Sequence, residues 1–83
     1  MRVTVRLFAR LREIAGASEL ARSAAAGTTI GGIWRQLVDE FPALEPYGRS
    51  ISSAVNLEYA RMDAEVRDGD EIAFLPPVSG GFR

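Results

Sequence analysis

The sequence predicts an α+β fold in which a mixed β-sheet packs against one main helix. Residues 2–8 alternate apolar and polar side chains, which is the two-residue period of a half-buried strand. Residues 28–41 place apolar side chains three and four positions apart, as on one face of an amphipathic helix. Residues 71–75 form another apolar run that begins directly after turn residues. One long helix between groups of strands is typical of a small sheet wrapped over a helix.

Composition argues against several classes of function. The 83 residues include no cysteine, histidine or lysine, so the chain lacks thiolate ligands, disulfides and the most common general base. The net charge of −1 is a poor match to a nucleic-acid binder. No apolar run approaches the roughly 18 residues that a membrane span needs. We therefore expect a cytoplasmic protein that binds no metal, membrane or nucleic acid and is not an enzyme on its own.

Two short segments separate the first strand from the main helix. Leu11 and Ile14 lie three residues apart and Gly16 follows them, which predicts a helical turn over residues 9–16. Residues 18–25 are compatible with two structures. Their alanines favour a helix, whereas a strand here would pair with the first strand as a long hairpin. We favour the strand.

The main helix, residues 28–41, is the clearest element. Thr28 or Thr29 supplies its N-cap oxygen, and Pro42 ends the run. The pair Gly31-Gly32 in the first turn costs about 1 kcal/mol per residue relative to alanine, which close packing onto the sheet would explain. The apolar stripe and the strand residues form the predicted core: Ile30, Ile33, Trp34, Leu37, Val38 and Phe41 against Val3, Val5, Leu7, Ile72 and Phe74.

The second half of the chain alternates loop and strand signals. Residues 42–50 predict a loop by composition. Residues 51–57 predict a strand that has Ile51, Ser53, Val55 and Leu57 on one face. Asp68-Gly69-Asp70 predicts a turn rather than a cation site, because this combination is turn chemistry.

The last strand, residues 71–75, is apolar on both of its faces. Ile72 and Phe74 would face the helix, whereas Ala73 and Leu75 would face outward. Apolar surface is therefore expected beside the segment that follows this strand.

That following segment predicts an extended tail. Pro76-Pro77 lacks backbone N–H groups, so the strand must end there and continue stiffly extended. Gly80-Gly81 has no Cβ atoms, so its backbone can approach another surface closely. From Pro76 to Gly81 the chain could span about 20 Å at roughly 3.3 Å per residue. We divide the chain into a domain over residues 1–75 and a tail over residues 76–83.

Three stretches of the sequence resemble one known family. They are Val3–Glu13, Ala54–Tyr59 and Asp68–Gly81. In these stretches the chain is similar to the MoaD/ThiS family of ubiquitin-like sulfur carriers, and most of all to the small sulfur-carrier subunit of molybdopterin synthase. The resemblance covers nearly the whole chain, and the stretch from Asp68 to Gly81 is its specific part. It implies a ubiquitin-like β-grasp fold, which agrees with the order of elements.

The resemblance also implies a mechanism. In this family an E1-like adenylyltransferase uses ATP to adenylate the carboxylate of the terminal glycine, which is then converted to a thiocarboxylate. The carrier inserts its tail into the large subunit of molybdopterin synthase and donates sulfur to a pterin precursor of the molybdenum cofactor. The carrier itself binds no cofactor. Catalytic groups belong to the partners, which fits a chain without cysteine, histidine and lysine.

Carried over residue by residue, the resemblance assigns roles along the tail. Gly81 would bear the adenylate and then the thiocarboxylate, and Gly80 would thread the partner's channel. The residues expected to bind partners come directly before this pair: Phe74, Leu75, Pro76, Pro77, Val78 and Ser79.

Two residues beyond the glycine pair depart from the family pattern. The family usually ends at the glycine, whereas Phe82 and Arg83 follow it here. While they remain, the carbonyl of Gly81 belongs to an amide and offers no carboxylate to activate. Some related carriers from other pathways resemble this arrangement and carry a short tail that a JAMM-type metalloprotease removes. The resemblance therefore implies processing at the bond between Gly81 and Phe82.

Two other functions stay open at this point. The same thiocarboxylate chemistry could serve cysteine, thiamine-like or secondary-metabolite synthesis. The chain could instead be a β-grasp binding module whose glycine pair does no chemistry. A binding module would tolerate Gly81→Ala, whereas a carrier would not.

Overall fold

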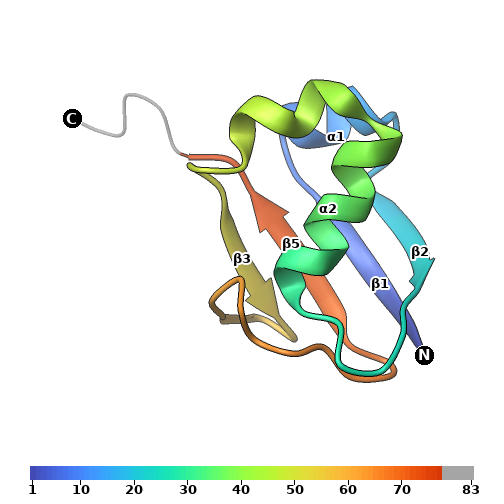
Figure 1. Ribbon diagram of the computed structural model, residues 1–83. Helices are drawn as coiled ribbons and strands as arrows, with labels where there is room; N and C mark the ends of the chain where they lie inside the picture. The colour runs from blue at the N-terminus through green and yellow to red at the C-terminus, as the bar shows by residue number, and fades with distance from the viewer. Residues whose placement is uncertain (78–83) are drawn as a thin grey trace.

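The computed structural model describes residues 1–77 and confirms the predicted α+β fold. Its elements are β1 (Arg2–Leu7), α1 (Arg10–Ala15), β2 (Glu19–Ser23), α2 (Ile30–Glu40), the 3-10 helix η1 (Pro42–Tyr47), β3 (Ser52–Val55), β4 (Glu58–Tyr59) and β5 (Glu71–Leu75). Helix α2 lies across one face of the sheet (Figure 1). No helix within residues 1–77 has the length and apolar character needed to cross a bilayer.

The five strands form one mixed sheet in the order β2-β1-β5-β3-β4. Strand β1 runs parallel to β5, with Val5 opposite Ile72, and antiparallel to β2. Strand β3 pairs antiparallel with both β5 and β4. The segment 18–25 therefore contains a strand, as favoured from the sequence. Because β5 lies in the middle of the sheet, the chain leaves the domain from the end of its central strand.

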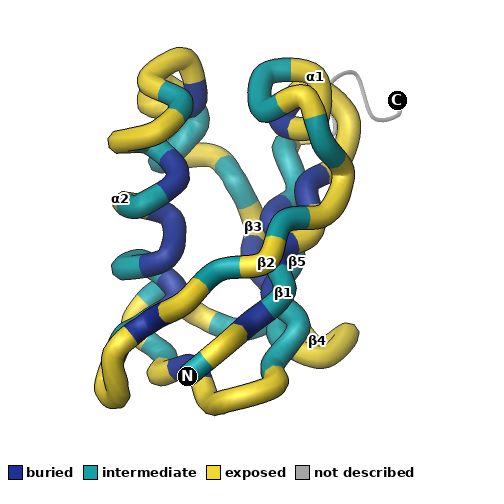
Figure 2. The backbone as a smooth tube through the Cα atoms, turned by 90° about the vertical axis from the view of Figure 1, so that its right-hand side faces the viewer, coloured by how far each residue is buried: buried dark blue, intermediate teal, exposed yellow. Residues whose placement is uncertain are grey.

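The core lies between α2 and the sheet, as predicted. Figure 2 shows that buried residues line the sides of α2 and of the strands that face one another. Trp34 is 8% exposed, and its ring centroid lies 5.0 Å from that of Phe74. Two predicted core residues, Val38 and Phe41, are only half-buried. Val38 lies at the rim of the stripe, and Phe41 is the C-cap residue beyond the last turn of α2.

The start of α2 is held by a cap and by a neighbouring loop. The side chain of Thr29 is the N-cap, and its Oγ1 accepts a hydrogen bond from the N–H of Gly32 at 3.1 Å. The N–H of Gly31 donates to the carbonyl of Met62 at 2.8 Å. A Cβ atom at Gly31 would lie 3.3 Å from that carbonyl oxygen. This glycine therefore allows close packing against the loop before β5, not against the sheet as expected.

Two parts of the second half differ from the prediction. Residues 42–47 form η1 rather than a loop, because Pro42 suits the first helical turn and Leu44 is fully buried. Strand β3 ends at Val55, whereas the predicted strand continues to Leu57, which is 92% exposed. Asn56 and Leu57 have φ angles of 51° and 74°, so they form the left-handed pair of a tight hairpin turn into β4.

Candidate functional site

The sheet face that points away from α2 carries an apolar surface with a shallow cavity. Strand pairing places four residues in one row across β1, β5, β3 and β4: Arg6, Ala73, Ala54 and Tyr59. Because the two central side chains of the row are alanines, the larger side chains around them enclose a cavity of about 290 Å³. We call this surface the outer-face patch, and its residues are Arg6, Phe8, Ala54, Leu57, Tyr59, Glu71, Ala73 and Leu75.

Three large apolar side chains of the outer-face patch are open to solvent. Phe8, Leu57 and Tyr59 are 37%, 92% and 80% exposed. They come from three segments: the end of β1, the turn between β3 and β4, and β4 itself. Exposed apolar side chains gathered around one depression are characteristic of a surface that binds another protein. The outer-face patch is therefore the candidate docking site.

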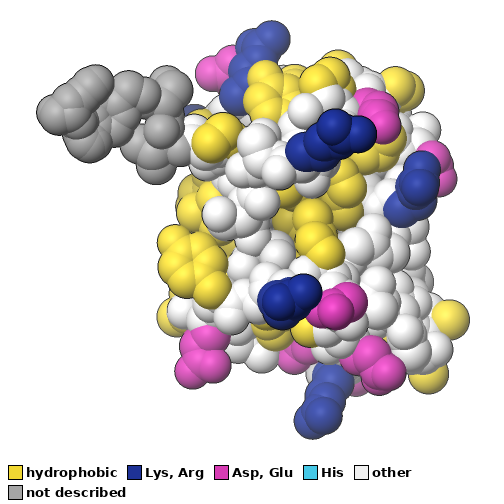
Figure 3. All heavy atoms as spheres, turned by 60° about the vertical axis from the view of Figure 1, so that its left-hand side comes forward, with side chains coloured by type: hydrophobic (Ala, Val, Ile, Leu, Met, Phe, Trp, Pro, Cys, Tyr) yellow, Lys and Arg dark blue, Asp and Glu magenta, His cyan; other side chains and the backbone are white. Residues whose placement is uncertain are grey.

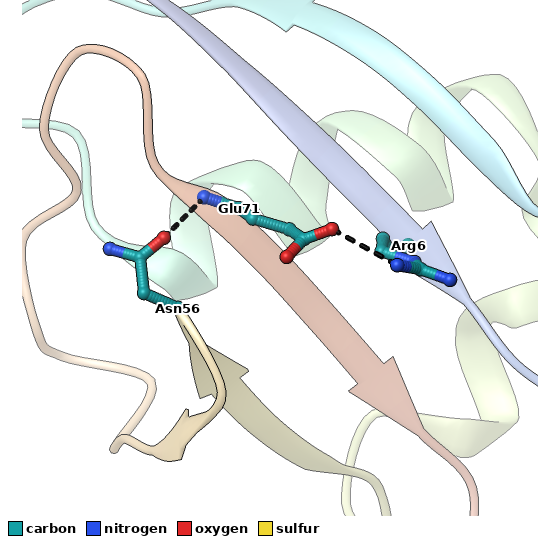
Figure 4. A network of polar contacts seen from close by, with 3 residues as sticks. All are labelled: Arg6, Asn56 and Glu71. Atoms are coloured by element: carbon teal, nitrogen blue, oxygen red, sulfur yellow. Dashed lines mark hydrogen bonds and ion pairs between the residues drawn. The ribbon is translucent and has the colours of Figure 1, made fainter.

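A polar network within and beside the patch links β1, β5 and the turn between β3 and β4. The Arg6 guanidinium lies 3.2 Å from the Glu71 carboxylate and 5.7 Å from the centre of the Phe8 ring. The side-chain oxygen of Asn56 accepts a hydrogen bond from the backbone N–H of Glu71 at 3.0 Å (Figure 4). The exposed ion pair contributes little stability by itself. Its effect is to orient Arg6 and Phe8, while Asn56 ties the hairpin turn to β5.

The base of the tail adjoins the outer-face patch. Leu75, the last residue of β5, is half-buried and lines the patch cavity. Pro76 follows it and is also half-buried, and Pro77 is exposed. Neither proline can donate a ladder hydrogen bond, so β5 ends here, as predicted. A protein that covers the patch would therefore also meet the chain where it leaves the sheet.

The predicted site residues divide into three groups. Leu75, Pro76 and Pro77 lie beside the outer-face patch, as a docking role requires. Phe74 does not, because its side chain points to the opposite face and is 0% exposed beneath α2. The prediction that Phe74 binds a partner is therefore wrong, and Phe74 is a core residue. The remaining predicted residues lie outside the described part of the chain: Val78, Ser79, Gly80, Gly81 and Phe82.

Sequence reasoning missed three members of the patch. The sequence pattern places Leu57 at the end of a strand rather than in a turn, and it gives Phe8 and Tyr59 no role. The signal that could have placed Leu57 is Asn56, which is common at the first central position of a two-residue hairpin turn. Phe8 and Tyr59 line the same cavity only because β1 and β4 belong to one sheet, which local sequence does not reveal.

The Asp68-Gly69-Asp70 segment is a turn, as predicted. Gly69 has a φ angle of 86°. The Asp68 carboxylate accepts the N–H of Arg2 at 2.7 Å, and the Asp70 carboxylate accepts the N–H of Arg67 at 2.8 Å. The Asp68 carboxylate therefore ties the turn to the start of β1, and the Asp70 carboxylate closes the turn. Among residues 1–77 no group of three potential metal-ligating side chains comes together.

The mixed sheet, the helix across its inner face and the exit of the chain from the central strand define a ubiquitin-like β-grasp protein. The sequence pattern of the ThiS family matches residues 5–81. The chain therefore belongs to the ThiS family.

Relatives of known name and structure agree with this assignment. The chain is 39% identical to the molybdopterin synthase sulfur carrier subunit of Arabidopsis thaliana, over 95% of this chain and 82% of the relative. The crystal structure of SAMP1 from Haloferax volcanii matches with a TM-score of 0.83 and 32% identity, over 98% of this chain and 100% of that one. A chain from the complex of subunits 1 and 2 of the molybdopterin-converting factor of Helicobacter pylori matches with a TM-score of 0.69 and 26% identity, over 98% and 100%.

Proposed function

We propose that this chain is a sulfur carrier for molybdenum cofactor biosynthesis, with Gly81 as the residue that bears the sulfur. The observation that carries the proposal is the continuity of the outer-face patch with Leu75 and Pro76. These two residues begin the segment that holds Gly80 and Gly81. A partner that docks on the patch would receive this segment at the same time. The similarity to sulfur carrier subunits supports the same role.

The proposed chemistry explains why the partner must be an enzyme and the carrier need not be. A carboxylate is a poor electrophile until one oxygen becomes part of a leaving group. An oxygen of the Gly81 carboxylate attacks the α-phosphorus of ATP, and pyrophosphate leaves. A sulfide equivalent then attacks the carbonyl carbon, the C–S bond forms, and AMP leaves. The thiocarboxylate sulfur then attacks a carbon of the pterin precursor and displaces an oxygen leaving group, which gives a thioester between Gly81 and the pterin. One water molecule hydrolyses the acyl C–S bond, so that the sulfur stays on the pterin and Gly81 regains its carboxylate.

Two partners divide this work. An E1-like adenylyltransferase in the cytoplasm binds ATP and activates Gly81. A large synthase subunit binds the pterin precursor and docks on the outer-face patch. The likeness to a chain of a two-subunit converting factor supports a partner of this kind. This chain contributes the surface and the acyl group, and it holds no cofactor of its own.

Activation at Gly81 requires that Phe82 and Arg83 first be removed. Hydrolysis of the peptide bond between Gly81 and Phe82 adds one water molecule and creates the carboxylate that ATP activates. A JAMM-type metalloprotease has the chemistry for this step, because its metal-bound water attacks a peptide carbonyl. The two residues act in this proposal as a block on premature activation.

Reconstitution tests the carrier function. A variant that ends at Gly81 is incubated with ATP, sulfide and an E1-like adenylyltransferase, and intact-mass spectrometry reports replacement of one oxygen by sulfur. We expect thiocarboxylate on this variant and none on the full-length chain. Gly81→Ala in the truncated chain is the matched control, and we expect it to react much more slowly. Equal reaction of all three chains would contradict the proposal.

A second candidate keeps the thiocarboxylate but changes the acceptor. Phe82 and Arg83 favour it. A short tail after the glycine pair resembles the removable tail of related sulfur carriers for cysteine, thiamine-like or secondary-metabolite synthesis. Supplying the thiocarboxylate chain to a large synthase subunit with pterin precursor separates the two functions. Dithiolene formation supports the molybdenum pathway, and loss of sulfur only to another acceptor supports the second candidate.

A further inference from the structure

A groove on the side of the molecule that carries α2 lies apart from the outer-face patch. It has a volume of about 500 Å³ and lies between α2 and the segment that contains η1. Its apolar walls come from Trp34, Val38, Pro46 and Met62. Figure 3 shows apolar side chains on one face of the molecule, with both basic and acidic side chains around them. The volume falls within the range of roughly 300–1,000 Å³ that is usual for ligand sites.

The indole N–H of Trp34 is an unused donor in this groove. Trp34 is 8% exposed, and its Nε1 makes no hydrogen bond within residues 1–77. No fully buried side-chain nitrogen or oxygen in this part of the chain lacks a partner, so Nε1 must keep contact with solvent. The N–H is therefore free to donate a hydrogen bond to an acceptor that enters the groove.

Gly48 keeps this donor accessible. A Cβ atom at Gly48 would lie 3.2 Å from Nε1 of Trp34. The φ angle of Gly48 is −58°, a value that any residue adopts, so the backbone does not require glycine here. The missing side chain instead leaves open space on the groove side of the indole N–H.

Two arginines at the groove carry charge without a partner. Arg35 and Arg49 line the groove, and neither guanidinium forms an ion pair or a hydrogen bond within the described residues. Elsewhere Arg22 pairs with Glu40, and Arg10 pairs with Glu13, whose hydrogen bond raises the pKa of Arg10. Among residues 1–77, the only acidic residue that lines the groove is Glu45, so the local charge is positive although the chain has a net charge of −1.

The shape of the groove favours an extended occupant. Met62 also lines a second cavity, of about 560 Å³, which continues to the edge strand β4. Ile51, Ala60 and Tyr59 form apolar wall along this continuation. Two neighbouring cavities that share Met62 in their walls and combine apolar surface with donors suit a peptide segment better than a compact metabolite. The groove reaches the outer-face patch only at Tyr59.

We propose that this groove binds an extended acidic segment of a partner protein. One carboxylate of the segment accepts hydrogen bonds from Nε1 of Trp34 and from Arg35 or Arg49, and neighbouring apolar side chains pack on Val38 and Met62. Such charge-assisted hydrogen bonds are stronger than neutral ones in a partly buried site. Because the groove lies largely off the outer-face patch, the segment can be bound while a partner occupies that patch.

A peptide titration followed by NMR tests this proposal. The probe is a synthetic hexapeptide that alternates glutamate and leucine, added to the full-length protein. Trp34 is the only tryptophan of the chain, so its single indole N–H resonance reports on the groove directly. We expect this resonance to shift saturably. Arg35→Gln and Arg49→Gln should each weaken binding roughly three- to tenfold, while Arg12→Gln on α1 should leave it unchanged.

Several results would overturn the proposal. An affinity weaker than about 1 mM, or equal binding of the matched glutamine–leucine peptide, would show that the groove does not recognise acidic segments. Equal binding of free acetate would assign the site to small carboxylates instead. A shift of the indole resonance on truncation after Pro77, without peptide, would make the chain's own tail the occupant. Because Arg35 and Arg49 are exposed, their glutamine variants should retain the fold, and none of these outcomes depends on sulfur chemistry.

Discussion

The two faces of β5 differ in the size and exposure of their side chains. On the inner face, Ile72 and Phe74 are both 0% exposed and pack beneath α2. On the outer face, Ala73 and Leu75 are half-buried and line an open cavity. The inner face is filled by large side chains, whereas the outer face has small side chains at its centre and large ones at its rim.

Strand β5 therefore contributes to stability with one face and to the proposed docking with the other. Burial of large side chains on the inner face contributes most of the stability of a small domain. The outer face leaves apolar surface uncovered, which a partner can bury without rearranging the core. Substitutions on the two faces should therefore separate stability from binding.

The largest expected effect is on the inner face. Phe74→Ala should lower the free energy of unfolding by about 3–5 kcal/mol, because it removes a buried ring in contact with Trp34. Urea denaturation measures this loss. Tyr59→Ala on the outer face is the matched control, and its effect should stay within about 0.5 kcal/mol because Tyr59 is 80% exposed. Similar losses for both variants would show that the two faces do not differ in this way.

A charge on the outer face should act on binding instead. Leu75→Glu should weaken binding to the proposed large subunit at least about tenfold, because a carboxylate would be buried in an apolar contact. The thermal midpoint should fall by only a few degrees, since Leu75 is half-buried. Calorimetric titration measures the affinity, and thermal unfolding measures the midpoint. A large drop in stability with unchanged affinity would assign Leu75 to the core.

The smallest expected effect is a gain in stability, at Leu57 in the turn between β3 and β4. Leu57 has a φ angle of 74°, which is strained for leucine and relaxed for glycine. Leu57→Gly should therefore raise the free energy of unfolding by roughly 0.5 kcal/mol. The same change removes an apolar side chain from the outer-face patch and should weaken docking. If Leu57→Gly destabilises the protein, the leucine supports the turn and is not held there for docking.

Local periodicity was sufficient to predict the central part of the core and most of the fold. The spacing of Ile30, Ile33 and Leu37 placed α2 correctly, and all three are 0% exposed. The alternation in residues 2–8 and 71–75 correctly placed the two parallel strands. These elements were predictable because one face of each is buried, and burial imposes its period on the sequence.

The candidate site was less predictable, for two physical reasons. The outer-face patch depends on strand order, which brings Phe8 and Tyr59 to one surface although about 50 residues separate them. Phe74 was assigned to docking by resemblance, although the alternation along β5 already placed it on the buried face. The groove beside Trp34 depends on η1, a helix that loop-like composition concealed.

The most direct test of the account is the mass of the protein isolated from its own cells. We predict a species that ends at Gly81, part of it with one oxygen replaced by sulfur. Alkylation of the thiocarboxylate should shift only the sulfur-containing part, which separates it from oxidation elsewhere. If the chain is found only with Phe82 and Arg83 attached, and this form supports sulfur transfer, the proposed role of Gly81 is contradicted.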